Sequence, residues 1–293
     1  MEYIDLHLHS SCSDGTMTPA ELVRAAVKAG IRGIAITDHD TIEGIAEALQ
    51  EGKKHGIEIV AGVEMSAYLD DTPLHILGYG FRHEDPILLK NLEKIQSARN
   101  ERNDRILTNL NLLGIDVTRD DLARHSRTGQ TGRPHIARLL VEKKVVKTMD
   151  EAFSRYLGKG GLAYAERKRL NAADAIAMIT AADGIAVLAH PLTIDQTMAT
   201  LPAVLTKMKE IGLAGVEAYY PIYSNTTRRR IIELSMHLGL LVTGGSDFHG
   251  ATRTGTCLGG CNKKQRAPYE LLLTLNNRLR SPGAAEIRMR NEE

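Results

Sequence analysis

Short apolar runs alternate with amphipathic helical segments along the first 80 residues of the chain. The runs have strand length, and between them apolar residues recur at helical spacing. We expect strands over residues 3–9, 33–37, 58–65 and 74–80. Helices are expected over residues 18–30, opened by a Thr18-Pro19-Ala20-Glu21 capping box and ended by Gly30, and over residues 41–55. This alternation favours a parallel sheet with helices outside it.

The pattern changes after Phe81, where a long stretch is polar and helical without strand signals. Helices are expected over residues 85–113, 120–125, 134–143 and 150–157. Residues 99–165 carry 13 Lys+Arg and 8 Asp+Glu, a net charge of +5. Strands return at residues 185–189, 215–220 and 240–245. We expect an α/β barrel formed by residues 1–98 and 166–293, with residues 99–165 inserted as a helical lid.

Composition and charge exclude several classes of protein. The 293 residues carry 37 Lys+Arg and 36 Asp+Glu, which argues against a strongly basic nucleic-acid-binding protein. We find no basic leader followed by an apolar run and no transmembrane stretch, so a cytoplasmic protein without membrane association is expected. No protein partner is evident. The spacing of Cys12, Cys257 and Cys261 predicts no disulfide framework.

Histidines and acidic residues gather where the expected strands end. His7 and His9 close the first strand one residue apart, so both side chains point to the same side. Asp14 follows in the next loop. The others lie at or near the ends of later strands: His39, Asp40, Glu64, His75, His190, Asp247 and His249. His75 fits least well, because it lies near the start of its strand. In a parallel barrel the strand ends open on one face, where imidazoles and carboxylates could hold divalent metal ions. A lone histidine there is more often a structural residue, but the joint pattern favours metal.

These motifs resemble those of the PHP (polymerase and histidinol phosphatase) family of metal-dependent phosphoesterases. The matching motifs are His7-x-His9, Thr37-Asp38-His39, Glu64, His190-Pro191 and Ser246-Asp247-x-His249. The resemblance implies a distorted (β/α)7 TIM-like barrel that holds two or three metal ions. It places His7, His9, Glu64 and Asp247 at the first ion, Glu64, His75 and His190 at the second, and Asp14, His39 and His249 at the third. We expect Mn²⁺, with Fe, Zn and Co as alternatives.

A metal-bound hydroxide would attack a phosphate ester at such a centre, because bound cations lower the pKa of water. The leaving alcohol then needs a proton. Asp40 or His249 could deliver it, directly or through water, and the sequence does not choose between them.

The substrate side is indicated by Gly132-Arg133-Pro134-His135, just before an expected helix. Arg133 and His135 at a helix N-terminus would form a phosphate clamp. The segment is similar to that of a nucleotide-phosphatase branch of the PHP family. This similarity implies removal of the 5′-phosphate from 3′,5′-nucleoside bisphosphates, such as adenosine 3′,5′-bisphosphate to AMP. Asp40, Tyr223 and Asn225 are further candidate substrate contacts.

Other functions remain open at this point. The main alternative is a 5′–3′ exoribonuclease on short 5′-phosphorylated RNA, although a near-neutral chain suits a small dianion better than a long polyanion. A histidinol-phosphate phosphatase is a further family alternative. A C–N hydrolase of the wider amidohydrolase superfamily could share the barrel and the metals. A non-catalytic metal- or nucleotide-binding module is the alternative from another class, and it is disfavoured because every expected ligand is present.

Overall fold

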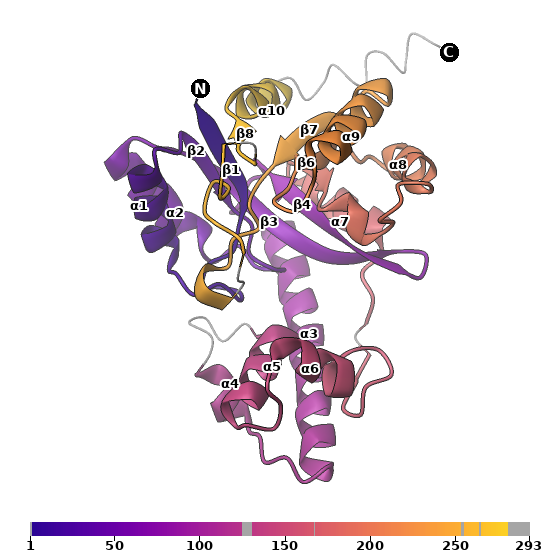
Figure 1. Ribbon diagram of the computed structural model, residues 1–293. Helices are drawn as coiled ribbons and strands as arrows, with labels where there is room; N and C mark the ends of the chain where they lie inside the picture. Colours follow the sequence, from indigo (N-terminus) through magenta and orange to yellow (C-terminus); the bar gives the residue numbers. More distant parts are fainter. Residues whose placement is uncertain (1, 125–130, 167, 253–254, 264, 281–293) are drawn as a thin grey trace.

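The computed structural model describes residues 2–124, 131–166, 168–252, 255–263 and 265–280 (Figure 1). Eight strands form one sheet in the order β7-β6-β5-β4-β3-β2-β1-β8. Their bounds are β1 Tyr3–Leu8, β2 Gly33–Ile36, β3 Glu58–Leu69, β4 Thr72–Tyr79, β5 Ile185–Leu188, β6 Gly215–Tyr219, β7 Leu241–Gly244 and β8 Ala267–Pro268. The sheet nearly closes on itself, because the segment after β7 bridges back to β1 through Leu8 and Phe248. The distorted, TIM-like barrel predicted from the sequence is therefore confirmed.

The prediction of an all-parallel sheet is wrong at β4. This strand pairs antiparallel with both β3 and β5, and the short β8 pairs antiparallel with β1. Only a tight turn separates β3 from β4, which is too short for the crossover that a parallel pair needs. The reversal places the start of β4 at the end of the barrel where the parallel strands finish. His75 therefore reaches the same end as the other candidate ligands.

Helices cover the outside of the sheet (Figure 1). Their bounds are α1 Pro19–Ala29, α2 Ile45–His55, α7 Ala172–Ala181, α8 Leu201–Glu210, α9 Asn225–His237 and α10 Glu270–Arg280. The capping box of Thr18 and Glu21 is confirmed, and Gly30 ends α1 in the left-handed conformation with φ 75°. Helix α2 begins four residues later than predicted, because the chain first turns at Ile42–Ile45.

The inserted segment is helical and has a hydrophobic core of its own. Its helices are α3 Pro86–Leu112, α4 Arg119–Ala123, α5 Arg133–Glu142, α6 Met149–Ala152 and a π-helical turn over Phe153–Leu157. Leu88 and Leu92, early in α3, pack into the core of the barrel, whereas Ile106 and Leu110 pack into the core of the insertion. The proposed boundary at residue 99 thus falls inside α3, which runs out of the barrel into the insertion (Figure 1).

Cys257 and Cys261 form a disulfide, which their spacing in the sequence did not lead us to expect. The chain between them reverses at Gly259 and Gly260, whose φ values of 71° and 91° suit glycine, and this brings the two Cα atoms to 4.8 Å.

In the part of the chain that the structure describes, no helix is long and apolar enough to cross a membrane.

Candidate metal centre

The candidate site lies at the end of the barrel, and part of its backbone is locally strained. Asp40, His190 and Asp247 have positive φ values of 53°, 26° and 51°, a conformation that residues other than glycine rarely adopt. Such strain concentrates at functional sites, where the surrounding structure holds it in place. Gly245 has a different role, because a Cβ atom there would lie 2.4 Å from the Cβ of His7. The absence of a side chain at Gly245 lets the segment after β7 approach His7.

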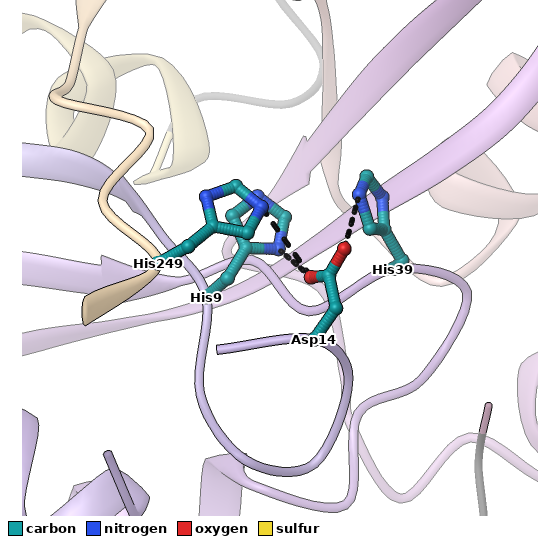
Figure 2. Close-up of side chains that lie close together, drawn as sticks. All are labelled: His9, Asp14, His39 and His249. Carbon is teal, nitrogen blue, oxygen red and sulfur yellow. Dashed lines mark ion pairs between the residues drawn. The ribbon is translucent and has the colours of Figure 1, made fainter. Parts of the chain in front are cut away.

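One group of ligands surrounds the carboxylate of Asp14 (Figure 2). Its Oδ1 lies 3.3 Å from Nε2 of His249 and 3.7 Å from Nδ1 of His9. Its Oδ2 lies 3.7 Å from Nε2 of His39. The three imidazole rings come from different segments of the chain and converge on one carboxylate, an arrangement that suits a divalent ion.

A second group surrounds Glu64, which is 1% exposed at the end of the barrel. Its Oε1 lies 2.7 Å from Nδ1 of His75 and 3.0 Å from Nε2 of His190. Its Oε2 lies 3.0 Å from Nδ1 of His39 and 3.1 Å from Nε2 of His9. Glu64 is thus placed to bridge neighbouring ions.

Asp247 and His7 complete this set of nine converging side chains. Oδ1 of Asp247 lies 3.2 Å from Nε2 of His9 and 3.5 Å from Nε2 of His7. The structure therefore brings together every ligand implied by the resemblance. It also places His39 beside both Asp14 and Glu64, rather than beside Asp14 alone.

The chemistry of these atoms fits a cation. The buried atoms Nε2 of His7, both ring nitrogens of His9, Nδ1 of His39 and Oε2 of Glu64 make no hydrogen bond within the described residues. Buried polar atoms are ordinarily paired, and a cation held between these atoms would pair them. Nitrogen and carboxylate donors together suit Mn, Fe, Zn or Co.

The charges of the clustered side chains shift one another's pKa values. Burial by itself lowers the pKa of His9, but Asp247 and Glu64 outweigh it and raise that pKa to about 10. Burial raises the pKa of Asp14, but the charges of His39 and His249 outweigh it and hold that pKa well below its usual range. Protonated imidazoles therefore supply positive charge that divalent ions would replace.

Two buried aspartates behind the ligands hold the loops that carry them. Asp38 accepts hydrogen bonds from the backbone N–H of Ser10 at 2.7 Å and from the hydroxyls of Ser10 and Ser13, and these serines adjoin His9 and Asp14. Asp5 accepts from the backbone N–H and the hydroxyl of Ser246, next to Asp247. Sequence reasoning missed these roles, together with that of Glu217, another buried acid. An acidic residue inside an otherwise apolar strand is the signal that could have found Asp5 and Glu217.

A cleft of about 210 Å³ lies between this centre and the inserted helices. Asp14, His39 and His75 line one side of it. The other side is lined by basic residues of α3 and α5: Arg99, Arg102, Arg133 and His135. Sequence reasoning missed Arg99 and Arg102, which stand three residues apart and so share a face of α3. The cleft therefore joins the candidate metal ligands to a wall of basic residues.

The predicted phosphate clamp lies in this wall. Gly132, rather than Arg133, is the N-cap of α5, and Arg133 is its first helical residue. Nδ1 of His135 accepts a hydrogen bond from the backbone N–H of Gly132 at 3.0 Å. A neutral ring that accepts at Nδ1 carries its proton on Nε2, so His135 offers a donor there.

Asp40 is engaged by the inserted helix α3. Its Oδ2 lies 2.5 Å from Nη2 of Arg99, and its Oδ1 accepts from the backbone N–H of Ser66 at 2.8 Å. The side chain of Gln96 also donates to the backbone carbonyl of Asp40. Asp40 therefore joins the barrel to the insertion beside the cleft.

The structure does not bring Tyr223 and Asn225 to the cleft. The hydroxyl of Tyr223 accepts from the backbone N–H of Leu192 at 3.1 Å, and its ring packs against Tyr220. Tyr220 in turn donates to Oδ2 of Asp247 at 2.7 Å. Asn225 is exposed at the start of α9, where its side chain accepts from Arg228. Tyr223 thus supports the loop after β5, and Asn225 lies at the start of α9, so their contact with a ligand stays a prediction.

Comparisons with known proteins agree with this geometry. The family model described as PHP domain matches residues 5–159. A 5′-3′ exoribonuclease of Haemophilus influenzae is 35% identical over 84% of this chain and 89% of its own length. A 3′,5′-nucleoside bisphosphate phosphatase of Chromobacterium violaceum is 32% identical over 88% and 91%. The crystal structure of an amidohydrolase from Chromobacterium violaceum, with bound sulfate and no metal, matches with TM-score 0.83 and 30% identity over 94% of this chain and 96% of that one.

Proposed function

Because the chain belongs to the PHP-domain family of phosphoesterases, we propose that it hydrolyses the 5′-phosphate of 3′,5′-nucleoside bisphosphates with Mn²⁺ as its cofactor. The observation that carries this proposal is the cleft, which has metal ligands on one side and Arg99, Arg102, Arg133 and His135 on the other. A ligand that spans the cleft needs an ester at the metal centre and a second anionic group at the basic wall. A nucleotide with phosphates at both ends of its ribose meets both requirements.

The residues divide into two functions in this proposal. His7, His9, Asp14, His39, Glu64, His75, His190, Asp247 and His249 would hold two or three divalent ions. When bound, such ions activate a water molecule as the nucleophile and neutralise phosphoryl oxygens. Arg133 and His135 would bind the second phosphate through the guanidinium fork and the Nε2 donor. Residues 99–165 act as a lid that fixes the distance between the two groups.

The proton for the leaving alcohol has two candidate donors, Asp40 and His249. Both carboxylate oxygens of Asp40 accept hydrogen bonds, from Arg99 and Ser66, so this side chain offers no proton as arranged. His249 uses Nδ1 on the backbone carbonyl of Asp247 at 2.8 Å, and its Nε2 faces Asp14 as a ligand atom. We therefore propose that water carries the proton and that Asp40 serves to position Arg99.

A second candidate function is 5′–3′ exoribonuclease activity on short 5′-phosphorylated RNA, favoured by the relative from Haemophilus influenzae. The phosphatase would place the 5′-phosphate at the metal centre, whereas the exonuclease would place there the phosphodiester that joins the first two nucleotides. In both cases a neighbouring phosphate would reach the basic wall. The cleft of about 210 Å³ leaves less room for three linked nucleotides than for one, which favours the mononucleotide.

The test is phosphate release in the presence of Mn²⁺ from adenosine 3′,5′-bisphosphate, AMP, histidinol phosphate and a 5′-phosphorylated RNA trimer. We expect fastest turnover of the bisphosphate, with 5′-phosphate removed and 3′-AMP as the product. Stepwise shortening of the trimer at a higher kcat/KM would instead assign the exonuclease. Turnover of none of the four would overturn the proposed substrate class.

A further inference from the structure

Glu217 lies beneath the metal centre and belongs to none of the ligand groups described above. It comes from the middle of β6, and its side chain is fully buried. One oxygen, Oε1, lies 2.9 Å from Nδ1 of His7. The other, Oε2, accepts a hydrogen bond from the backbone N–H of His190 at 2.8 Å. A buried carboxylate is costly unless it is hydrogen-bonded, and here each oxygen has a partner on a different ligand residue.

The contact with His7 decides which ring nitrogen faces the centre with a lone pair. A carboxylate can only accept, so Nδ1 of His7 must donate its proton to Glu217. Nε2 of His7 is thereby left as the ligand atom, and it lies 3.4 Å from Glu64 and 3.5 Å from Asp247. Ligand histidines commonly depend on such a partner for both tautomer and ring orientation.

The contact with His190 holds a strained peptide in place. His190 has φ 26° and ψ 62°, well outside the regions that most residues occupy. Its backbone N–H is fixed by Glu217, and its Nε2 reaches Glu64 at 3.0 Å. The position of this imidazole therefore depends on a side chain from the neighbouring strand. Strain of this kind persists only where surrounding contacts enforce it.

We propose that Glu217 is a positioning residue that assembles two of the metal sites together, through the tautomer of His7 and the backbone of His190. The inference rests on the metal centre proposed above and adds a role for a residue that touches no substrate. The group around Asp14, His39 and His249 has no contact with Glu217 among the described residues, so that site should assemble without it.

The variant Glu217→Gln tests this role because an amide keeps the shape but has only one accepting oxygen. If that oxygen faces His190, the amide NH₂ faces Nδ1 of His7 and forces the proton onto Nε2, where it blocks metal binding. If the oxygen faces His7, the NH₂ opposes the backbone N–H of His190. Either arrangement therefore disturbs one ligand residue, His7 or His190. The matched control is Ser235→Ala, which removes another fully buried hydrogen bond, from Ser235 to the carbonyl of Ile231 in α9.

The experiment measures Mn²⁺ affinity and stoichiometry by titration, and the Tm in EDTA and in excess Mn²⁺, for the wild type and both variants. We expect Glu217→Gln to weaken the affected Mn²⁺ sites about 10- to 100-fold and to reduce the Mn²⁺-induced rise in Tm. Ser235→Ala should bind Mn²⁺ like the wild type. Unchanged Mn²⁺ binding by Glu217→Gln, or an equal loss in Ser235→Ala, would overturn the role of Glu217. A wild type that binds no Mn²⁺ would overturn the metal centre itself.

A second measurement needs no variant and so does not depend on the folding of Glu217→Gln. In protein labelled with ¹⁵N-histidine and loaded with diamagnetic Zn²⁺, NMR reports which ring nitrogen of His7 carries the proton. The proposal requires the proton on Nδ1. A proton on Nε2 would overturn it.

Discussion

Replacing Arg133 tests whether the wall of the cleft opposite the metal ligands binds the second phosphate. Arg133 is half-buried in the first turn of α5 and lines the cleft, where Nη1 donates to the carbonyl of Leu157 at 3.3 Å. Arg133→Met keeps much of the length and the apolar stem of the side chain while removing its charge.

The size of the effect follows from the kind of bond that is lost. A hydrogen bond to a charged group contributes about 1.5–3 kcal/mol, which corresponds to about a 10- to 150-fold change in an equilibrium constant. We expect KM for adenosine 3′,5′-bisphosphate to rise by that factor with little change in kcat, because the contact lies away from the reacting phosphate. AMP has no 3′-phosphate, so its kcat/KM should stay near the wild-type value.

The assay is the initial rate of phosphate release from both substrates, with Arg138→Met as the matched control. Arg138 lies on the same helix but does not line the cleft, so its replacement makes the same charge change without touching the ligand. An equal decrease in kcat/KM for the bisphosphate and for AMP would refute the second phosphate site. An equal decrease in kcat/KM in Arg133→Met and Arg138→Met would instead show a general effect of the charge of the lid.

Three further predictions concern the metals and the lid. His9→Asn and Asp247→Asn should each abolish phosphate release and lower bound Mn²⁺, measured by elemental analysis, while circular dichroism stays like that of the wild type. Ile106→Ala, in the core of the insertion and fully buried, should lower the free energy of unfolding by about 2–5 kcal/mol in a urea titration. The pKa of His9 is raised to about 10 when no metal is bound. Protonation of His9 therefore stabilises the folded protein fully below pH 6.5, and this stabilisation is lost as the pH rises through 10. Mn²⁺ must displace that proton, so its affinity should increase with pH, and calorimetry in two buffers should detect proton release.

The convergence of the candidate ligands was predictable because two simple regularities act together. Side chains alternate along a strand, so His7 and His9 share a side, and the strands of a barrel end on one face. The position of His75 was not explained by those rules, since its strand runs opposite to its neighbours. Strand direction depends on the length of the connection, and the turn between β3 and β4 falls inside a stretch whose apolar pattern continues on both sides.

The substrate wall was predictable only in part. Arg133 and His135 stand out because a proline and a helix start adjoin them, and both line the cleft. Arg99 and Arg102 are hidden among the many charges of α3, since a polar helix gives no sign of which face turns inward. Tyr223 and Asn225 follow a strand end as expected, but they do not line the cleft. The chain turns after β6, and Tyr223 supports the loop after β5.

The buried acids behind the candidate ligands could not be predicted from the spacing of residues in the sequence. Asp5, Asp38 and Glu217 are each almost fully buried, and each accepts hydrogen bonds from segments that carry metal ligands. An apolar residue at any of these positions would pack well but would leave buried N–H groups without acceptors. Because the ligand loops are short and strained, their N–H groups cannot turn towards solvent or towards one another. Carboxylates behind the loops are therefore a physical consequence of crowding nine candidate ligands at the end of one barrel.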